Sequence, residues 1–231
     1  MEKTIFEKLQ AHVFDEGNPW VDIWEDKNPR PNKLPYIASW AYYDENVDIH
    51  KQPLADEVIR GLNNNVVFVA RNFSIPLPST WRFWDNIHGD NNVRWLLDGK
   101  KFSPGKYRGA YITDIVKNFV GPDVMREMDD PGFKKNVGWF FEEIDLLGSD
   151  GIEMYLFGND VAAIFREHVM RHNGFPAFRK KVRKCQHINS YGRPNTRFEK
   201  LAPEELGLRA KSDPLPVLRF LWNDDDKGDA K

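Results

Sequence analysis

The 231-residue sequence has very little cysteine, since Cys185 is the only one. A single thiol cannot form a disulfide within its own chain. It also excludes an iron–sulfur cluster or a zinc site built only from cysteines of one chain. The cysteine content therefore fits a reducing compartment.

Long hydrophobic runs and strong net charge are missing as well. No run approaches the roughly 18 apolar residues of a membrane helix, and no apolar signal segment stands at the N-terminus. We therefore expect a cytoplasmic protein with no membrane partner. The formal net charge of -2 excludes nucleic-acid binding through overall charge and leaves only a local basic patch for that purpose.

Several well-known catalytic motifs are absent too. The sequence has no Walker phosphate loop, no dinucleotide glycine fingerprint and no serine nucleophile elbow. Its one helical histidine pair, His168 and His172, lacks the glutamate that directly follows the first histidine in zinc proteases. These absences argue against a kinase, a dehydrogenase or an α/β-hydrolase, and we predict no cofactor and no metal site.

What the sequence does contain is a series of short apolar segments that predict strands. The first, residues 66–70, is β-branched or aromatic almost throughout, which is typical of a strand buried on both faces. Similar segments lie at 108–112 and 152–157, and a fourth ends at His187. Amphipathic patterns predict helices at 4–14, 53–62, 93–97, 130–148, after Asn159 and at 204–208.

This alternation of strands and helices predicts the α/β class. We expect one domain over residues 1–200, a three-layer α/β/α structure with a short, mainly parallel four-stranded sheet. Residues 18–53 are interpreted as an irregular flank. Residues 201–231 are expected to form a C-terminal extension with a disordered acidic tail.

Polar residues follow the predicted strands, and ligands of parallel sheets bind beyond the carboxyl ends of the strands. Each such residue also has a structural interpretation. His187 could be a satisfied core histidine, Asn72 could stabilise a turn, and Asp114 could cap a helix beginning at Ile115. Asn159 or Asp160 could cap the following helix. Their shared location at one sheet edge is what favours a functional site.

Four of these segments resemble motifs of the uracil-DNA glycosylase superfamily, in the right order and over about residues 60–195. VVFVARNFS resembles its first motif, an apolar strand ending in Gly-x-Asn/Asp-Pro-Gly, although Ala70 replaces the first glycine. GAYITDIVKNF and MYLFGNDVAAIF resemble its second and third strands. CQHINSYG resembles its closing His-Pro-Ser motif, with Ile188-Asn189 in place of Pro-Ser. The cysteines of the iron–sulfur branch are absent.

The resemblance implies a DNA glycosylase that hydrolyses the N-glycosidic bond of a flipped modified or mismatched base. By position, Asn72 would place the attacking water and His187 would stabilise negative charge on the leaving base. Because a neutral amide is not a strong base, Asn72 suggests a slow or mismatch-type enzyme or an inactive relative. Asp114 occupies the position where much of the family has an asparagine that reads uracil.

The resemblance also implies the remaining binding residues. Phe73 would stack near the extruded base. The other substrate-binding positions are Arg71, Ser74, Asn189 and Ser190. The expected partner is DNA, with Tyr191 and Arg193 as candidate wedges and Arg197 and Lys184 as candidate phosphate contacts.

Two other functions stay open. A non-catalytic member of the same fold could bind a nucleic acid or nucleotide, which the motif departures favour. A hydrolase of free nucleosides is favoured by the lack of net positive charge. The basic run at 179–184 is likewise compatible with either a solvated surface or a DNA patch.

Overall fold

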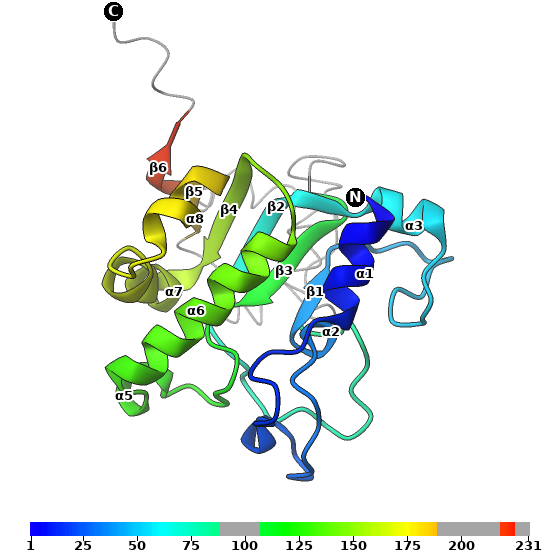
Figure 1. Cartoon of the computed structure of the whole chain (residues 1–231), viewed down its shortest axis with the longest axis horizontal. Coiled ribbons are helices and arrows are strands. Elements are labelled where there is room, and N and C mark those ends of the chain that lie inside the picture. The colour runs from blue at the N-terminus through cyan, green and yellow to red at the C-terminus, as the bar shows by residue number, and fades with distance from the viewer. Residues whose placement is uncertain (88–106, 189–217, 225–231) are drawn as a thin grey trace, which may run out of the picture.

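A computed structural model describes residues 1–87, 107–188 and 218–224 and places a six-stranded sheet at the centre of the fold (Figure 1). The strand order is β1-β3-β2-β4-β5-β6. The strands are β1 Ala38–Trp40, β2 Asn63–Ala70, β3 Ala110–Asp114, β4 Ile152–Phe157, β5 Val182–Ile188 and β6 Leu218–Asn223.

The sheet is mixed, with a parallel centre. β2 pairs in parallel with β3 and β4, and β4 pairs in parallel with β5. β1 and β6 add an antiparallel strand at each edge. The prediction of four strands was therefore wrong, although the four predicted strands form the parallel centre.

The two missed strands carry little signal of their own. β1 is three residues long and lies within the flank interpreted as irregular, and β6 lies in the predicted C-terminal extension. Both are edge strands. Such a strand joins the sheet because the neighbouring strand has unpaired backbone N–H and C=O groups that it can bond. Here those neighbours are β3 and β5, which lie far from β1 and β6 in sequence.

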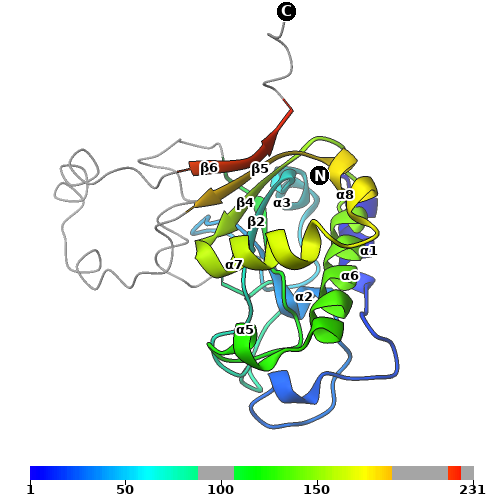
Figure 2. The same ribbon diagram turned by 90° about the vertical axis from the view of Figure 1, so that its left-hand side faces the viewer.

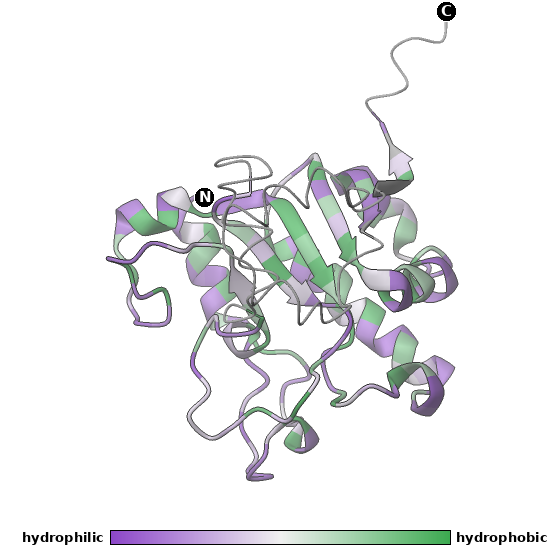
Figure 3. Cartoon of the chain, turned by 180° about the vertical axis from the view of Figure 1, so that it is seen from behind, coloured by the Kyte–Doolittle hydropathy of each residue, from purple (hydrophilic) through white to green (hydrophobic). Residues whose placement is uncertain are grey.

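The central strand β2 is buried on both faces, as its composition predicts. Val67 and Val69 belong to the larger hydrophobic cluster, whereas Val66 and Phe68 belong to a second cluster on the opposite face. Strands buried in this way occur in sheets that are covered on both sides. Figure 3, which views the chain from behind, shows that the central strands are largely hydrophobic.

The helices described by the structure pack against the first face. Figure 2 shows α6, α7 and α8 on one side of the sheet. The second cluster contains no residue of a described helix, so a second helical layer is not seen in residues 1–87, 107–188 and 218–224. The helices are α1 Lys3–Ala11, α2 Leu34–Ile37, α3 Asp56–Gly61, α5 Val124–Glu127, α6 Asp130–Leu146, α7 Gly158–Ile164 and α8 Phe175–Lys181. A 3-10 turn covers Val21–Ile23, and a π-helical segment, Phe165–Val169, continues α7.

The helices predicted near residues 4, 53, 130 and 159 are confirmed, but their first turns differ from the prediction. α1 begins at Lys3, one residue before the predicted start, and its N-cap residue Glu2 makes no side-chain cap. α3 begins at Asp56, three residues after Pro53. α6 is capped by Asp129, whose carboxylate accepts from the Gly132 N–H at 2.8 Å. The helices predicted at 93–97 and 204–208 lie outside the described residues.

None of the described helices has the length and apolar character needed to cross a bilayer.

A fully buried polar cluster ties the end of β3 to α6. The Lys117 ammonium forms an ion pair with Glu143 and donates to Thr113 Oγ1 at 3.1 Å and to the carbonyl of Asp114 at 2.8 Å. The Tyr111 hydroxyl donates to the other Glu143 oxygen at 2.6 Å, and burial raises the pKa of this tyrosine well above its usual value. All three ammonium protons therefore have acceptors, which offsets the cost of burying the charge.

We expect Glu143→Ala to destabilise the fold by about 3–5 kcal/mol, because it leaves the buried Lys117 without its counter-ion. Urea unfolding would measure the change. The double variant Lys117→Met, Glu143→Leu should lose less unfolding free energy than the sum of the losses in Lys117→Met and in Glu143→Leu. Arg126→Gln is the matched control, since that ion-paired side chain is exposed and should contribute little. Additive losses in the double variant would contradict this account.

Candidate functional site

The candidate site lies at the carboxyl edge of the parallel strands. The chain leaves β2 toward β3 on one side, whereas it leaves β4 through α7 toward β5 on the other side. Adjacent parallel strands whose connections diverge in this way form a topological switch point, where open α/β sheets bind their ligands. The switch point here lies between the ends of β2 and β4.

Arg71 bridges this switch point. Its Nη1 forms an ion pair with Asp160, which lies just beyond β4, and its Nε donates to Asn72 Oδ1 at 2.8 Å. Asp160 therefore does not cap α7, whose N-cap is Phe157 with no side-chain cap. The Asp160 side chain is 56% exposed, so a ligand can reach the ion pair from solvent.

Asn72 is almost buried and its amide is oriented by its neighbours. The Nδ2 group donates to the carbonyls of Phe73 at 2.8 Å and Gly121 at 2.7 Å, so it must be the nitrogen side of the amide. The Oδ1 atom accepts from Arg71, which leaves one of its two acceptor positions. Asn72 thus holds the segment after β3 against the end of β2 and presents a fixed oxygen beside Arg71.

The loop that follows β2 is pinned on both sides of a short exposed stretch. Phe73 pairs with the chain near Val120, and Leu77 exchanges backbone hydrogen bonds with the segment around Trp24. Between these anchors Ser74 is exposed, and Ile75 is 70% exposed. The Phe73 ring is buried, so base stacking would require it to move. Ile75 is not among the predicted site residues, although an apolar residue in a proline-rich loop is a signal for one.

Asp114 ends β3 as predicted and is fully buried. Its Oδ2 accepts from the Asn86 amide at 2.9 Å, and its Oδ1 has no hydrogen-bond partner among the described residues. Burial raises the pKa of Asp114 to about 6, against the lowering effect of the Asn86 hydrogen bond and the Lys117 charge. No helix begins at Ile115, whose N–H bonds to the Ala70 carbonyl, so the capping interpretation is wrong.

His187 lies within β5, buried and level with Leu156. Because side chains alternate along a strand, it shares a face with Cys185, which belongs to the cluster under the helices. Asp114 is level with Ala70 and on the opposite face. Three strand spacings, about 14 Å, also separate β3 from β5. The strand ends therefore bring together Arg71, Asn72 and Asp160. Asp114 and His187 lie far from each other, on opposite faces of the sheet.

One of the predicted DNA contacts, Lys184, lies among the described residues. Lys184 lies in β5 opposite Glu153. The neighbouring basic residues form ion pairs, which favours a solvated surface for the 179–184 run. These pairs are Arg179 with Asp224 at 2.5 Å, Lys181 with Asp145 at 2.8 Å and Arg183 with Glu153 at 2.5 Å. The predicted site residues Asn189, Ser190, Tyr191, Arg193 and Arg197 lie outside the described residues.

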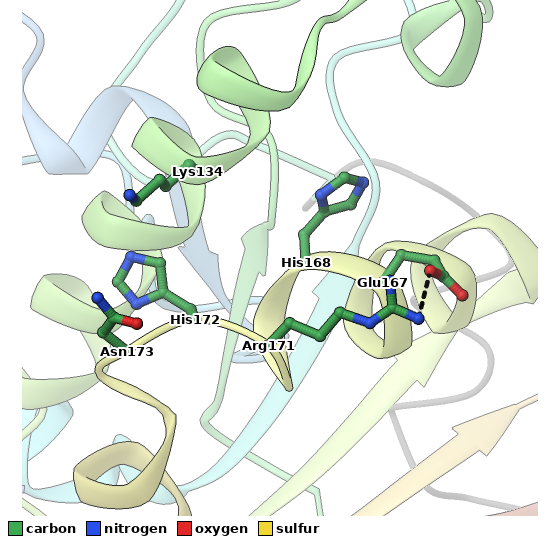
Figure 4. A pocket seen from close by; sticks show the side chains of 6 residues that line it. All are labelled: Lys134, Glu167, His168, Arg171, His172 and Asn173. Atoms are coloured by element: carbon green, nitrogen blue, oxygen red, sulfur yellow. Dashed lines mark ion pairs between the residues drawn. The ribbon is translucent and has the colours of Figure 1, made fainter.

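A separate shallow cavity of about 210 Å³ lies between α6 and the end of the π-helical segment (Figure 4). His168 stacks on Phe133 with 4.2 Å between ring centroids, and His172 meets Phe141 edge-on at 5.1 Å. Across the part of the chain that is described, no three histidine, cysteine or acidic side chains are grouped to hold a metal ion. The cavity is lined by Lys134, Glu167, His168, Arg171, His172 and Asn173.

No protein-family model, curated protein or solved structure matches this chain. The geometry of the carboxyl edge and the chemistry of its residues are therefore what bears on its function.

Asp114 should give the fold a measurable pH dependence. Its pKa of about 6 in the folded chain lies above the 3.8 of an ordinary aspartate, so the folded state binds this proton more tightly. The stabilisation is fully present below pH 3.8 and is lost as the pH rises through about 6. Asp114→Asn should remove this contribution, on the order of 2–3 kcal/mol in unfolding free energy.

Urea unfolding at several pH values between about 4 and 8 would test this. The exposed Asp150→Asn variant is the control and should keep the wild-type pH dependence. An Asp114→Asn variant with the wild-type pH dependence would show that Asp114 does not bind the proton.

Proposed function

We propose that this chain is a DNA glycosylase-like hydrolase that cleaves the N-glycosidic bond of a flipped modified or mismatched base. The observation that carries the proposal is the oriented amide of Asn72. Its Nδ2 is held by two backbone carbonyls, and its Oδ1 retains one acceptor position next to the switch point. That oxygen is suited to accept a hydrogen bond from a water molecule and so to orient it.

The charges around Asn72 suit the same reaction. Cleavage of an N-glycosidic bond builds positive charge on the sugar and negative charge on the departing base, so fixed groups of both signs favour it. The Asp160 carboxylate supplies a negative group at the mouth of the site, and Arg71 supplies donors between it and Asn72. Asn72 remains a weak base, which points to slow turnover.

Asp114 would read the base. An ionised carboxylate only accepts hydrogen bonds and would repel the O4 oxygen of uracil, whereas a protonated one donates to it. With a pKa of about 6, the side chain changes between these states near neutral pH. We infer that plain uracil is a poor substrate at neutral pH and that a base with two donor groups fits better.

Two features of the loop after β2 favour DNA as the substrate. No acidic residue occurs from Arg71 to Arg82, so this stretch does not repel phosphates. Ile75 is exposed between two anchored segments close to Asn72, and an exposed apolar side chain can contact bases that become unstacked when one is flipped.

A non-catalytic member that binds a flipped base or nucleotide is the second candidate. The observation that favours it is the same amide, since its nitrogen is fully used to hold the chain after β3. Asn72 would then be a structural residue of a binding pocket.

Asn72→Ala should lower the single-turnover rate of base excision by about a hundredfold and change DNA affinity by less than about threefold, because the amide acts mainly in the transition state. The substrate is chosen by screening duplexes that each carry one modified base for abasic-site formation. Thermal melting of the variant checks the fold. Equal excision rates would remove Asn72 from the chemistry, and no excision from any duplex would favour the binding-only candidate.

Asp114→Asn should raise excision of uracil relative to other bases, since an amide both accepts from the N3–H and donates to O4. The measurement is the ratio of single-turnover rates on uracil and on the preferred base, at about pH 7.5. Wild-type excision of uracil should also increase as the pH is lowered toward 5, and this increase should be absent in the variant. An unchanged ratio would exclude Asp114 from base recognition.

A further inference from the structure

The cavity between α6 and the π-helical segment gathers donors that the proposed glycosylase reaction does not use. It lies away from the carboxyl edge, since the helical segment from Asp160 to Val169 alone spans roughly 14 Å and His172 follows its end. The α-helical pattern widens at Phe165–Val169, where the Met170 N–H reaches back to the Phe165 carbonyl at 2.9 Å. Such π-helical turns occur frequently at functional sites.

His172 presents a fixed N–H to this cavity. Its Nδ1 accepts a hydrogen bond from the Gly174 N–H at 3.1 Å, so in the neutral ring the proton is on Nε2. Burial, and then the charge of Lys134, lowers the pKa of His172, which keeps the ring neutral near pH 7. The edge-on contact with Phe141 holds the ring plane. Nε2 is thus a donor that needs no protonation.

Among the described residues that line the cavity, positive charge exceeds negative charge. Of the residues that the structure describes, Glu167 is the one carboxylate that lines the cavity, and it pairs with Arg171 at 3.0 Å. Burial lowers the pKa of His168, although the charges of Asp130 and Glu167 act in the opposite direction. Its ring packs on Phe133. Within the described residues Lys134 has no ion-pair partner, so its ammonium is the uncompensated charge.

Figure 4 shows the Lys134 ammonium, the His172 ring and the Asn173 side chain on the same side of the cavity, with the Arg171–Glu167 pair on the other side. We propose that Lys134, His172 and Asn173 form a binding site for a small tetrahedral oxyanion, either inorganic phosphate or a phosphate monoester. An ammonium, an imidazole N–H and an amide NH₂ together supply charge and donors to several oxygens of one anion. The Arg171–Glu167 pair borders the site and limits its size.

The test uses isotopically labelled full-length chain and inorganic sulfate, which stays doubly charged near pH 7. At constant ionic strength, sulfate should shift the His172 ring and Asn173 amide resonances with saturation. Before sulfate is added, the ¹⁵N shifts of His172 should report the Nε2–H tautomer. Lys134→Gln and His172→Phe should each raise the dissociation constant about tenfold or more, since each removes a donor to a charged ligand. For His172→Phe the Asn173 amide is the reporter.

Lys135→Gln is the matched control. Lys135 is adjacent in α6 but pairs with Asp15 at 2.9 Å and lies over the Trp139 ring, so it does not line the cavity. Its replacement should change the dissociation constant less than twofold. A shift that never saturates, an equal loss in Lys135→Gln or an Nδ1–H tautomer would overturn the proposal.

A second comparison separates the sources of the anion. Thymidine monophosphate should compete with sulfate, whereas a short oligothymidylate without terminal phosphates should compete much more weakly. Stronger competition by the oligothymidylate would replace the proposed monoester site with a contact to the DNA backbone. Because none of these measurements depends on base excision, their outcome is independent of the glycosylase proposal.

Discussion

The burial of β2 on both faces is the constraint on which the rest of the structure depends. A strand with Val66 and Phe68 on one face and Val67 and Val69 on the other is stable only between two neighbouring strands and under cover on both sides. β3 and β4 supply the neighbours, and both run parallel to β2. Parallel neighbours bring the ends of the three strands to one edge, which is why polar residues far apart in sequence meet there.

The buried polar groups around this edge differ in how completely they are hydrogen-bonded. Lys117, Glu143 and Tyr111 form a network on the helical face that Thr113 Oγ1 and the Asp114 carbonyl complete, and such a network holds the end of β3 rigidly. Asp114 has one oxygen without a partner among the residues that are described, and burial raises its pKa. A group left in this state costs stability, and such sites are often functional. Both residues are buried, but the unpartnered oxygen makes Asp114 a better candidate for ligand contact than Lys117, whose three ammonium protons already have acceptors.

The two candidate sites differ in how they are built. At the carboxyl edge, Arg71 and Asn72 follow one strand and Asp160 follows another, so the site exists only because the sheet pairs β2 with β4. The cavity beside α6 depends instead on helix packing, which sets Lys134 next to His172. The first site thus has an exposed ion pair, and the second has an ammonium with no ion-pair partner among the described residues.

The sequence by itself determined the four parallel strands and the longer helices, because runs such as Val66–Val69 and the apolar stripe of α6 favour one local structure. It also located Asn72 and Asp114 at strand ends. Only the tertiary structure decided that β1 and β6 join the sheet, that His187 faces the helices, and that Asp160 pairs with Arg71 rather than capping α7. The physical reason is distance along the chain: Arg71 and Asp160 are 89 residues apart, and no local pattern records which partner a charged side chain meets after folding.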